Sequence, residues 1–405
     1  MACPKSRKPC EKKRRDMDRR TFVRSAVVGT LASSVLSSCS WAPRGSDQTA
    51  AATGKKALGI PGPFPGRVIE VHHPGSVVRR KVQREPVHEM VERGMVDLTG
   101  ASDATEAWRM FFEPGDVVGV KVNPVGKPKA ISSFELVHEV CDGLKGAGVK
   151  PQDIVVFDRY RKQFMDAKYH KKLPEGVRWE GSVHDYDDVQ LDIEGYDPDV
   201  YREIDLAAVN HHDPNDDRIR RSHLSLIVSR KVNKIINLPV LKDHGSAGVT
   251  LALKNMSHGF VNNVARSHGS GTTNACNTFI PAIVSMQPIR EKVVLHILDG
   301  TTAVFEGGPG ASIATIWNNR TMHFATDPVA MDRIGMEIVD KVRLQKGLAR
   351  VAQSYWITPS EEEGKSFHSY RQPQHIELAS ALGLGVFNRE EIEGKPRIEL
   401  SRVEL

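Results

Sequence analysis

The feature that most constrains the fold is a series of short, continuously apolar segments with amphipathic segments between them. Residues 116–123 (DVVGVKVN) and 153–158 (DIVVFD) have the composition of strands, and Ser132-x-x-Glu135 between them forms a capping box that opens a helix toward Gly146. Strands that are apolar throughout, rather than at alternate positions, are typical of a parallel sheet covered on both faces. We therefore predict an α/β fold with a mostly parallel, doubly wound sheet and helices on both faces.

The same pattern continues toward the C-terminus. Further apolar, β-rich runs are expected to be strands, at residues 225–232, 233–240 and 292–300. Asp327-Pro328 has the form of a helix start, because Asp caps free amides and Pro suits the first turn. After Lys341, helical character near 337–349 and 374–382 predicts a packing role for the C-terminal segment.

The first 38 residues have the pattern of an export signal. Arg19-Arg20 forms a twin-arginine pattern, and the uncharged residues 25–38 that follow are fewer than the roughly 20 that span a bilayer. Leu36-Ser-Ser-Cys39 resembles a lipobox, so we predict acylation of Cys39 and a membrane-tethered lipoprotein in the periplasm or at the cell surface. Cleavage nearby, with Cys39 incidental, is the alternative. Met1 and Met17 are both candidate initiators.

The organisation after the signal follows from composition. Residues 39–66 are rich in Ala, Gly, Pro, Thr and Lys without a hydrophobic period, which predicts a flexible tether before an α/β domain at 67–405. The formal net charge of +6 comes from residues 1–24, and the remainder of the chain carries −1. Because nucleic-acid binding needs clustered Lys and Arg on one face, we predict no nucleic-acid partner.

Cysteine usage excludes two kinds of metal site. Beyond the N-terminal region only Cys141 and Cys276 remain, without any CxxC pair, so a cysteine-ligated iron–sulfur cluster or a four-thiolate zinc site is excluded. Cys141 lies in an apolar-periodic segment and is expected to be a buried structural thiol. A disulfide between the two cysteines stays open.

Reactive side chains gather where the predicted strands end. In open α/β sheets, ligands bind beyond the carboxyl ends of the strands. Asn123 follows one strand and the polar, glycine-bearing segment 237–259 follows another, while Asp299 leaves a third strand ahead of Glu306 and the glycine-rich loop 307–310. We expect these segments to meet around one cleft.

Each residue type in this cleft suggests a role. Lys242 and Lys254 are predicted to clamp an anionic group, His244 to transfer a proton, and Asp299 and Glu306 to act as general base or metal ligand. Ligand- or cofactor-binding positions would be completed by Asn123, Asn255, Gly307 and Gly308. The alternative is a structural cleft in which the two lysines pair with Asp243, Asp299 or Glu306.

A divalent metal is a second possibility for the same segment. His258 lies four residues after Lys254, on the same face if this segment is helical. His244 and His258 with Asp299, or with another carboxylate in its place, would form the nitrogen and oxygen ligand set typical of zinc, iron or nickel. His268 and His296 are further candidate ligands.

Several spaced motifs together resemble the domain-of-unknown-function 362 family, over about residues 117–332. They are Asn237-Leu-Pro-Val-Leu-Lys242-Asp-His244, Leu-Ala-Leu-Lys254-Asn255 with Gly259, Leu298-Asp299-Gly300 with Glu306-Gly307-Gly308-Pro309, and Ala325-Thr-Asp327-Pro328-Val-Ala-Met-Asp332. The resemblance implies an α/β fold and an uncharacterised site. Some members carry cysteine-rich ferredoxin segments, which this chain lacks.

A second resemblance concerns His244 and Lys254 alone. Their H-x9-K arrangement is similar to the segment of nickel-pincer lactate racemases whose lysine bears the cofactor and whose histidine transfers protons. It implies that Lys254 anchors or contacts a cofactor.

We therefore expect an exported, lipid-anchored, cofactor- or metal-dependent enzyme, isomerase- or oxidoreductase-like, that acts on a small anionic substrate. The alternative is a non-catalytic, anion-binding lipoprotein. Expected partners are the anionic ligand, the twin-arginine export machinery and the membrane.

Overall fold

The structure is a computed structural model, which describes residues 57–187, 190–206, 215–268, 274–359, 366–392, 394 and 396–405. The predicted export signal, Cys39 and most of the predicted tether lie outside the described residues. Nine helices are described: α1 (Arg84–Thr99), α2 (Ala104–Arg109), α3 (Phe134–Gly146), α4 (Arg161–Asp166), α5 (Leu251–Phe260), α6 (Cys276–Val284), α7 (Gln287–Lys292), α8 (Pro328–Gln345) and α9 (His375–Ala381). In the part of the chain that the structure describes, none of the helices has the length and apolar character needed to cross a bilayer.

The described strands come in chain order. They are β1 (Arg67–His72), β2 (Val77–Val78), β3 (Lys81–Val82), β4 (Val118–Lys121), β5 (Ile154–Tyr160), β6 (Arg178–Val183), β7 (Tyr196–Glu203), β8 (Arg221–Ser225), β9 (Lys234–Asn237), β10 (Val240–His244), β11 (Gly248–Val249), β12 (Val293–Val304), β13 (Ile316–Ala325), β14 (Tyr355–Pro359), β15 (Ser366–Tyr370) and β16 (Glu399–Glu404).

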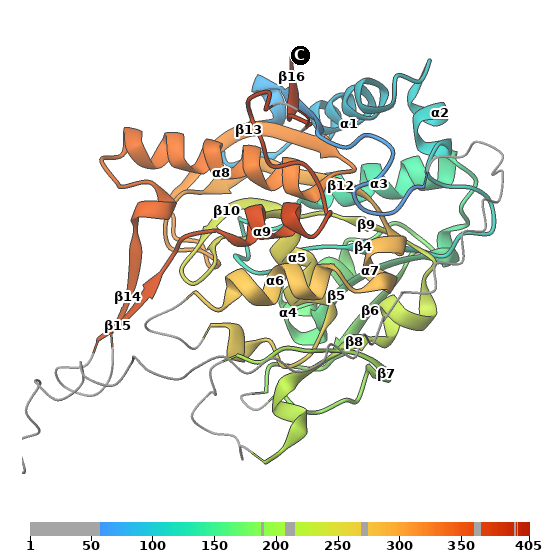
Figure 1. The fold of residues 1–405 in the computed structure, drawn as a ribbon. Helices are drawn as coiled ribbons and strands as arrows, with labels where there is room; N and C mark the ends of the chain where they lie inside the picture. The colour runs from blue at the N-terminus through green and yellow to red at the C-terminus, as the bar shows by residue number, and fades with distance from the viewer. Residues whose placement is uncertain are drawn as a thin grey trace, which may run out of the picture. The chain divides into compact units, whose positions relative to one another are not determined.

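One large sheet organises these elements (Figure 1). Its strand order is β16-β1-β13-β12-β9-β4-β5-β6, and the run from β12 to β6 is parallel throughout. β13 runs antiparallel to its two neighbours, β12 and β1, and the short β11 runs antiparallel to β10. β10 continues from β9 and pairs in parallel with the far half of β12, with Val240 opposite Asp299. The predicted mostly parallel α/β fold is confirmed.

Helices cover both faces of the sheet (Figure 1), which explains why its strands are apolar throughout. Along β5, Ile154 and Val156 pack in the core beneath α1 to α3, whereas Val155 and Phe157 pack in the core that α5, α6 and α8 cover. Successive side chains along such a strand therefore point alternately into the two cores, and no side chain in the middle of the strand faces water.

The helix starts predicted from local sequence motifs are correct to within one residue. Asp327 caps α8 by accepting from the amides of Val329 and Ala330, both at 2.9 Å, as the sequence predicts. The cap of α3 is Ser133 and not Ser132, because the Ser132 hydroxyl is taken by the carbonyl of Leu238 at 2.6 Å. The predicted strand at 225–232 is wrong over most of its length, since residues 227–231 form a π-helical turn.

The predicted tether is too long at its C-terminal end. Ile60 is buried and its amide donates to the carbonyl of Arg290 at 2.7 Å. Phe64 packs edge-on against Phe111, with ring centroids 6.5 Å apart. These two apolar side chains anchor residues 57–66 to the body, so the α/β domain begins before residue 67.

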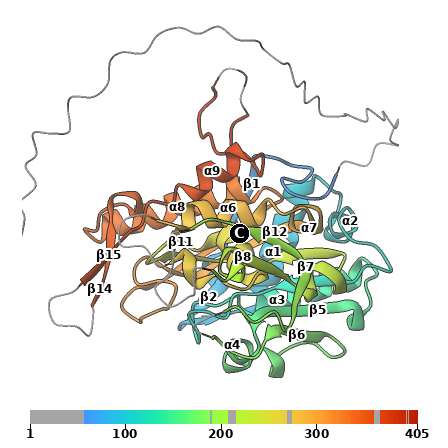
Figure 2. The same ribbon diagram turned by 60° about the horizontal axis from the view of Figure 1, so that its bottom comes forward.

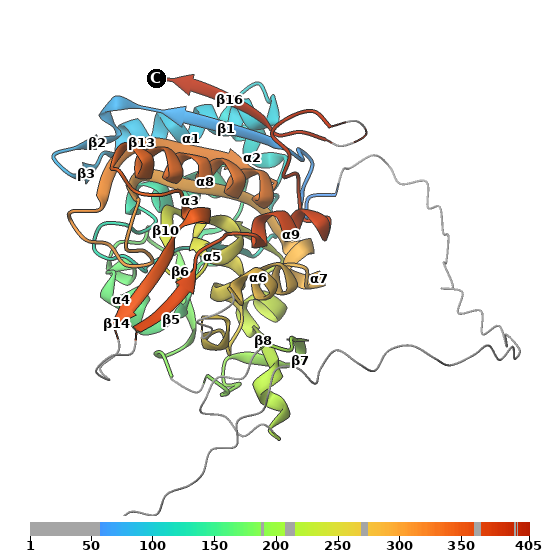
Figure 3. The same cartoon turned by 60° about the vertical axis from the view of Figure 1, so that its left-hand side comes forward.

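Two further elements lie at the margins of the body. The β14–β15 hairpin projects from its rim (Figure 2). β16 lies beside β1 at the edge of the sheet, in parallel and in register from Arg67 opposite Glu399 to His72 opposite Glu404 (Figure 3). Cys141 and Cys276 are both buried and free, so no disulfide joins them.

Candidate functional site

A cleft of about 250 Å³ opens at the carboxyl ends of β4, β5 and β10, beside α5. The sequence-predicted residues that line it are Asn123, Lys242, His244, Lys254, Asn255, His258 and His268. The structure thus brings together amine, amide and imidazole groups from three separate segments of the chain, at the place where a parallel sheet offers a binding site.

The first turn of α5 is held in place by a residue of α8. Leu251 has a φ of +43°, and the side chain of Thr250 before it makes no capping bond. Asp332 supplies the cap instead, by accepting from the amides of Ala252 at 2.7 Å and Leu253 at 2.9 Å. Because the carboxylate fixes the start of α5, it also fixes Lys254, which lies in the first turn.

The two predicted anion-binding lysines are buried without ion-pair partners. Lys242 Nζ donates to Asn123 Oδ1 at 2.9 Å and to the carbonyls of Val125 and Pro309. Lys254 Nζ lies 3.4 Å from His268 Nε2. Neither ammonium forms an ion pair with a carboxylate of the described residues, in contrast to Lys121 of the same cleft, which binds Asp158 at 2.7 Å. Burial lowers the pKa of Lys242 to about 7 and that of Lys254 to about 8.

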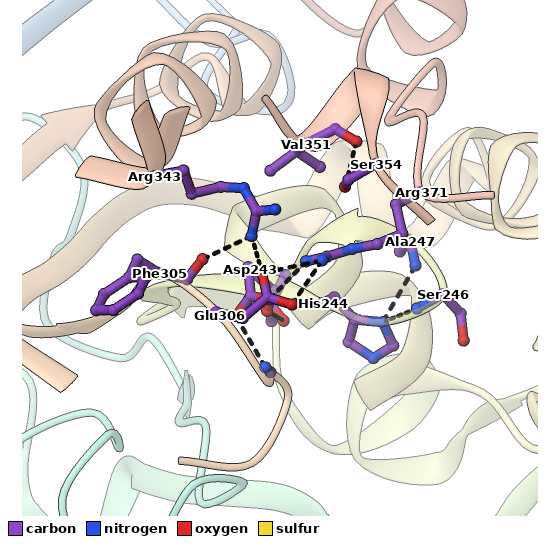
Figure 4. A network of polar contacts seen from close by, with 12 residues as sticks. Asp243, His244, Ser246, Ala247, Phe305, Glu306, Arg343, Val351, Ser354 and Arg371 are labelled. Carbon is purple, nitrogen blue, oxygen red and sulfur yellow. Dashed lines mark hydrogen bonds and ion pairs between the residues drawn. The ribbon is translucent and has the colours of Figure 1, made fainter. Parts of the chain in front are cut away.

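His244 is locked in one tautomer. Its Nδ1 accepts from the amides of Ser246 at 3.0 Å and Ala247 at 3.1 Å (Figure 4), so the ring proton must be on Nε2. Burial, followed by the charge of Lys254, holds the pKa of His244 well below its usual range. His244 is therefore a neutral hydrogen-bond donor, and its Nε2 has no lone pair for a metal while these two contacts persist.

A chain of amides fixes the floor of the cleft. Asn123 Nδ2 donates to Asn255 Oδ1 at 3.0 Å, and Asn255 Nδ2 donates to Asn237 Oδ1 at 2.7 Å. Asn237 Nδ2 then reaches Nδ1 of His296 at 3.2 Å. Asn123 and Asn255 are thus occupied in positioning Lys242 and one another, and His296 is a buried terminus of this chain.

A group of metal-ligand type lies behind Lys254. One ligand atom each of His258, His268 and Cys276 lies within 4.8 Å of the others. The His268 ring also packs 5.4 Å from that of His244 and 5.0 Å from that of His258. The sequence pointed to His258 and made His268 available, but Cys276 gave no signal because no second cysteine or histidine stands at ligand spacing beside it.

Asp299 lies outside this cleft, which corrects its prediction as a general base or metal ligand. Its Oδ2 accepts from the amide of Ser133 at 2.8 Å, and its Oδ1 accepts from the amide and the hydroxyl of Thr301 at 3.0 and 2.6 Å. A carboxylate with three such donors is fully engaged. Asp299 holds the start of α3 to the sheet, and the expected metal set of His244, His258 and Asp299 does not come together.

Glu306 and Asp243 belong to a buried ion-pair network (Figure 4). Arg371 Nη2 lies 2.5 Å from Asp243 Oδ2, and its Nη1 lies 3.1 Å from Glu306 Oε1. Arg343 also binds Glu306. The structure places Glu306 in an ion-pair network rather than in the cleft. Two of the three carboxylates that were expected as partners of the lysines, Asp243 and Glu306, pair with arginines instead.

The glycine-rich loop serves the same network. The amide of Gly308 donates to Asp243 Oδ1 at 2.8 Å, and a Cβ on Gly308 would lie 2.0 Å from the backbone oxygen of Asp243. Gly307 and Gly308 do not line the cleft, so their prediction as ligand-binding positions is corrected. The close approach that requires glycine is made by β10 rather than by a ligand.

Comparisons with known proteins give a family and little more. A crystal structure of a Thermotoga maritima protein from a structural genomics consortium aligns over 66% of this chain and 60% of that chain, with 10% identity and a TM-score of 0.35. This chain thus spans about three fifths of that protein's length, and the likeness is too slight to bear on function. A comparison with curated proteins finds no significant match. The family model described as Domain of unknown function (DUF362) matches residues 118–337, more than half of the chain, and the chain therefore belongs to the DUF362 family.

Proposed function

We propose that this protein is an exported, lipid-anchored enzyme that binds a small anionic substrate in the cleft around Lys242 and Lys254 and uses a metal or another cofactor there. One observation carries the proposal: two buried ammonium groups face the cleft without a carboxylate partner among the described residues. Desolvating an unpaired charge costs several kcal/mol. An anion between the two lysines would offset that cost.

The remaining polar groups of the cleft suit an anion as well. Arg159 also lines the cleft, and its Nη1 is buried without a hydrogen-bond partner in the described part of the chain. His244 offers an Nε2–H, which can donate to a carboxylate, phosphate or carbonyl oxygen. A volume of about 250 Å³ is below that of drug-sized pockets, which favours a small ligand.

The locked tautomer refines the role proposed for His244. A general base needs a free lone pair on the nitrogen that faces the substrate, and Nε2 of His244 carries the proton. We therefore assign His244 the donor role, in which its Nε2–H stabilises negative charge on the substrate by a hydrogen bond.

The residues fit a cofactor held by Lys254. The amine is buried and free of carboxylates, and the imidazole of His268 stands beside it. Such a group would supply hydride transfer, which no side chain supplies, or would assist removal of a proton from the substrate. Among the described residues that line the cleft, the one carboxylate, Asp158, already binds Lys121 and is not free to act as a base. The similarity of the His244 and Lys254 spacing to lactate racemases supports the same proposal.

Export and anchoring rest on the sequence pattern at Arg19-Arg20 and Cys39. In the native host, we expect Arg19→Lys with Arg20→Lys to leave the protein in the cytoplasm and Cys39→Ser to release it from the membrane fraction. Fractionation followed by immunoblotting measures both. A Cys39→Ser variant that stays with the membrane would remove the lipid anchor from the proposal.

The engagement of Asp158 with Lys121 also favours the second candidate, an anion-binding lipoprotein without chemistry. Isothermal titration with sulfate, inorganic phosphate and lactate tests the cleft in both cases. Each lost charge-assisted contact is worth about 1.5–3 kcal/mol, so Lys254→Met and Lys242→Met should weaken anion binding roughly 10- to 100-fold.

A matched control keeps this test specific. Lys292 is a half-buried lysine at the amino end of β12 that donates to the carbonyls of Val228 and Ser229, and Lys292→Met should leave anion affinity unchanged. Equal affinities in Lys254→Met and the unaltered protein would refute the site. His244→Phe, which removes the Nε2–H donor and keeps both lysines, should weaken anion binding less than Lys254→Met and abolish turnover if the protein is an enzyme, which separates the two candidates.

A further inference from the structure

The histidine–cysteine group beside Lys254 has the composition of a catalytic rather than a structural metal site. One ligand atom each from His258, His268 and Cys276 lies within 4.8 Å of the others. In a tetrahedral site with metal–nitrogen bonds of about 2.0–2.1 Å and a metal–sulfur bond of about 2.3 Å, such atoms lie roughly 3.5 Å apart. The three donors therefore need to close by about 1 Å. Three protein ligands leave a fourth position for a water or a substrate atom.

The group is open on one side and closed on the other. His258 and His268 both line the cleft, whereas Cys276, the first residue of α6, is completely buried behind them. His258 follows Lys254 by one turn of α5 and His268 ends the short turn after Ser267, so three separate segments converge here. His268 Nε2 lies 3.4 Å from Lys254 Nζ, whereas His268 Nδ1 faces Ser267, so a metal on the Ser267 side would be one imidazole ring away from Lys254.

Ser267 stands at the point where the three donors meet. Its hydroxyl lies 2.9 Å from His258 Nε2, 3.2 Å from His268 Nδ1 and 3.8 Å from the sulfur of Cys276, and it donates to the carbonyl of Val264 at 2.7 Å. The hydroxyl occupies the place that the three donors share. Because it gives its own hydrogen to Val264, His258 Nε2 and His268 Nδ1 donate to it and must release or shift those protons before they bind a metal. A metal at that place either takes the hydroxyl as a weak ligand or displaces it by rotation of the Ser267 side chain.

We propose that His258, His268 and Cys276 bind one divalent transition metal of the borderline class, zinc, cobalt or nickel, beside the anion-binding cleft. Two imidazoles and one thiolate select this class over magnesium and calcium, which prefer oxygen. On binding, the thiol of Cys276 loses its proton to solvent and forms the metal–sulfur bond. The metal's action on the substrate rests on the proposed function, but its binding does not.

Cobalt titration tests the ligand set directly. Protein purified without metal is titrated with Co²⁺ in the absence of reductant, and the near-ultraviolet absorption of a thiolate-to-cobalt charge transfer is recorded with the bound metal per chain. We expect one cobalt per chain and a charge-transfer band. Zinc should abolish the band at equal concentration, since both ions take the same ligands.

Variants separate this site from nonspecific binding. Cys276→Ser should remove the charge-transfer band, whereas Cys141→Ser, which alters the other buried free cysteine in α3, should retain it. His268→Gln should weaken cobalt binding at least tenfold. Ser267→Ala should leave the band in place, because it removes the hydroxyl that stands among the ligands without removing a ligand.

Two results would overturn the proposal: no charge-transfer band in the unaltered protein, or the same band in Cys276→Ser. Circular dichroism of each variant establishes that it is folded, and where Cys276→Ser does not fold, loss of the band in folded His268→Gln decides the question. Sulfate affinity is measured in parallel. If the unaltered protein binds sulfate but not cobalt, only this inference is rejected. If it binds cobalt but not sulfate, only the proposed function is rejected.

Discussion

The ion pair between Arg371 and Asp243 is the contact whose loss we expect to destabilise the body most. Both side chains are completely buried, with Arg371 at 0% and Asp243 at 0% exposure, and the two charges lie 2.5 Å apart. Burial already raises the pKa of Asp243. Among the described residues, Arg371→Met would leave the buried Asp243 carboxyl with the Gly308 amide as its remaining hydrogen-bond partner, whether it stays charged or takes up a proton. Breaking a buried pair in this way costs about 3–5 kcal/mol, because the remaining charge has no compensation.

The size of the thermal shift follows from the size of the domain. At about 2.1 cal/mol/K per residue, a body of roughly 350 residues unfolds with an entropy of about 0.7 kcal/mol/K, so 3–5 kcal/mol corresponds to about 4–7 °C. Urea unfolding followed by circular dichroism gives the free energy of unfolding, and calorimetry gives the temperature. Arg93→Met is the matched control: Arg93 pairs with Asp97 on the surface of α1 and is about half exposed, so its loss should cost below about 1 kcal/mol.

A double variant tests whether the charges of Asp243 and Arg371 stabilise one another. Asp243→Asn with Arg371→Met removes both charges and should be less destabilised than the sum of the single variants, because no charge is stranded. Glu306→Gln should lower the free energy of unfolding less than either single variant, Asp243→Asn or Arg371→Met, because the Glu306 side chain is 26% exposed and its charge is partly solvated. Additive single effects, or an Arg371→Met variant within 1 kcal/mol of Arg93→Met, would contradict the assignment of this network as a stabilising one.

Three further predictions concern the cleft and its surroundings. Sulfate keeps its charge above pH 3, so its affinity should fall as the pH rises through about 7, where the ammonium of Lys242 loses its proton, and Lys242→Met should flatten this part of the profile in isothermal titration. Gly308→Ala should destabilise the fold by about 1–3 kcal/mol or more in urea, because its Cβ would meet the backbone oxygen of Asp243 at 2.0 Å; an unchanged midpoint would contradict the close approach. Asp299→Asn should lower stability by about 1–3 kcal/mol through Ser133 and leave sulfate affinity unchanged, and a loss of affinity would return Asp299 to the site.

Much of the fold was predictable because strand burial leaves a direct trace in composition. The apolar runs around Val120, Val156 and Ile236 indicated a sheet covered on both faces, and Asp327-Pro328 placed the start of α8. The turn at 227–231 escaped prediction because Ile227 and Val228 are buried there as they would be in a strand, and short apolar runs do not distinguish the two.

The lysines and the histidine of the cleft could be predicted from the sequence, whereas the positions of the carboxylates could not. Lys242 and His244 lie in the last three residues of β10 and Lys254 lies in the first turn of α5, and proximity along the chain keeps them near the strand ends. Asp299 lies within β12 and Glu306 follows it, but their partners, Ser133 and Arg371, lie more than 60 residues away in the chain. Which of two nearby groups a carboxylate binds depends on such long-range packing, and no local pattern reports it.

The last strand of the sheet bears on how the body is built. Every residue of β1 is paired with one of β16, more than 300 positions later, so the outer edge of β1 has no neighbour until residue 404 has left the ribosome. Contacts of such long range slow the search for the native state and leave an open strand edge for the whole time of synthesis. Factors that shield nascent chains would therefore matter more for this protein than for one whose edge strands pair early, and premature termination would yield a product that aggregates through β1.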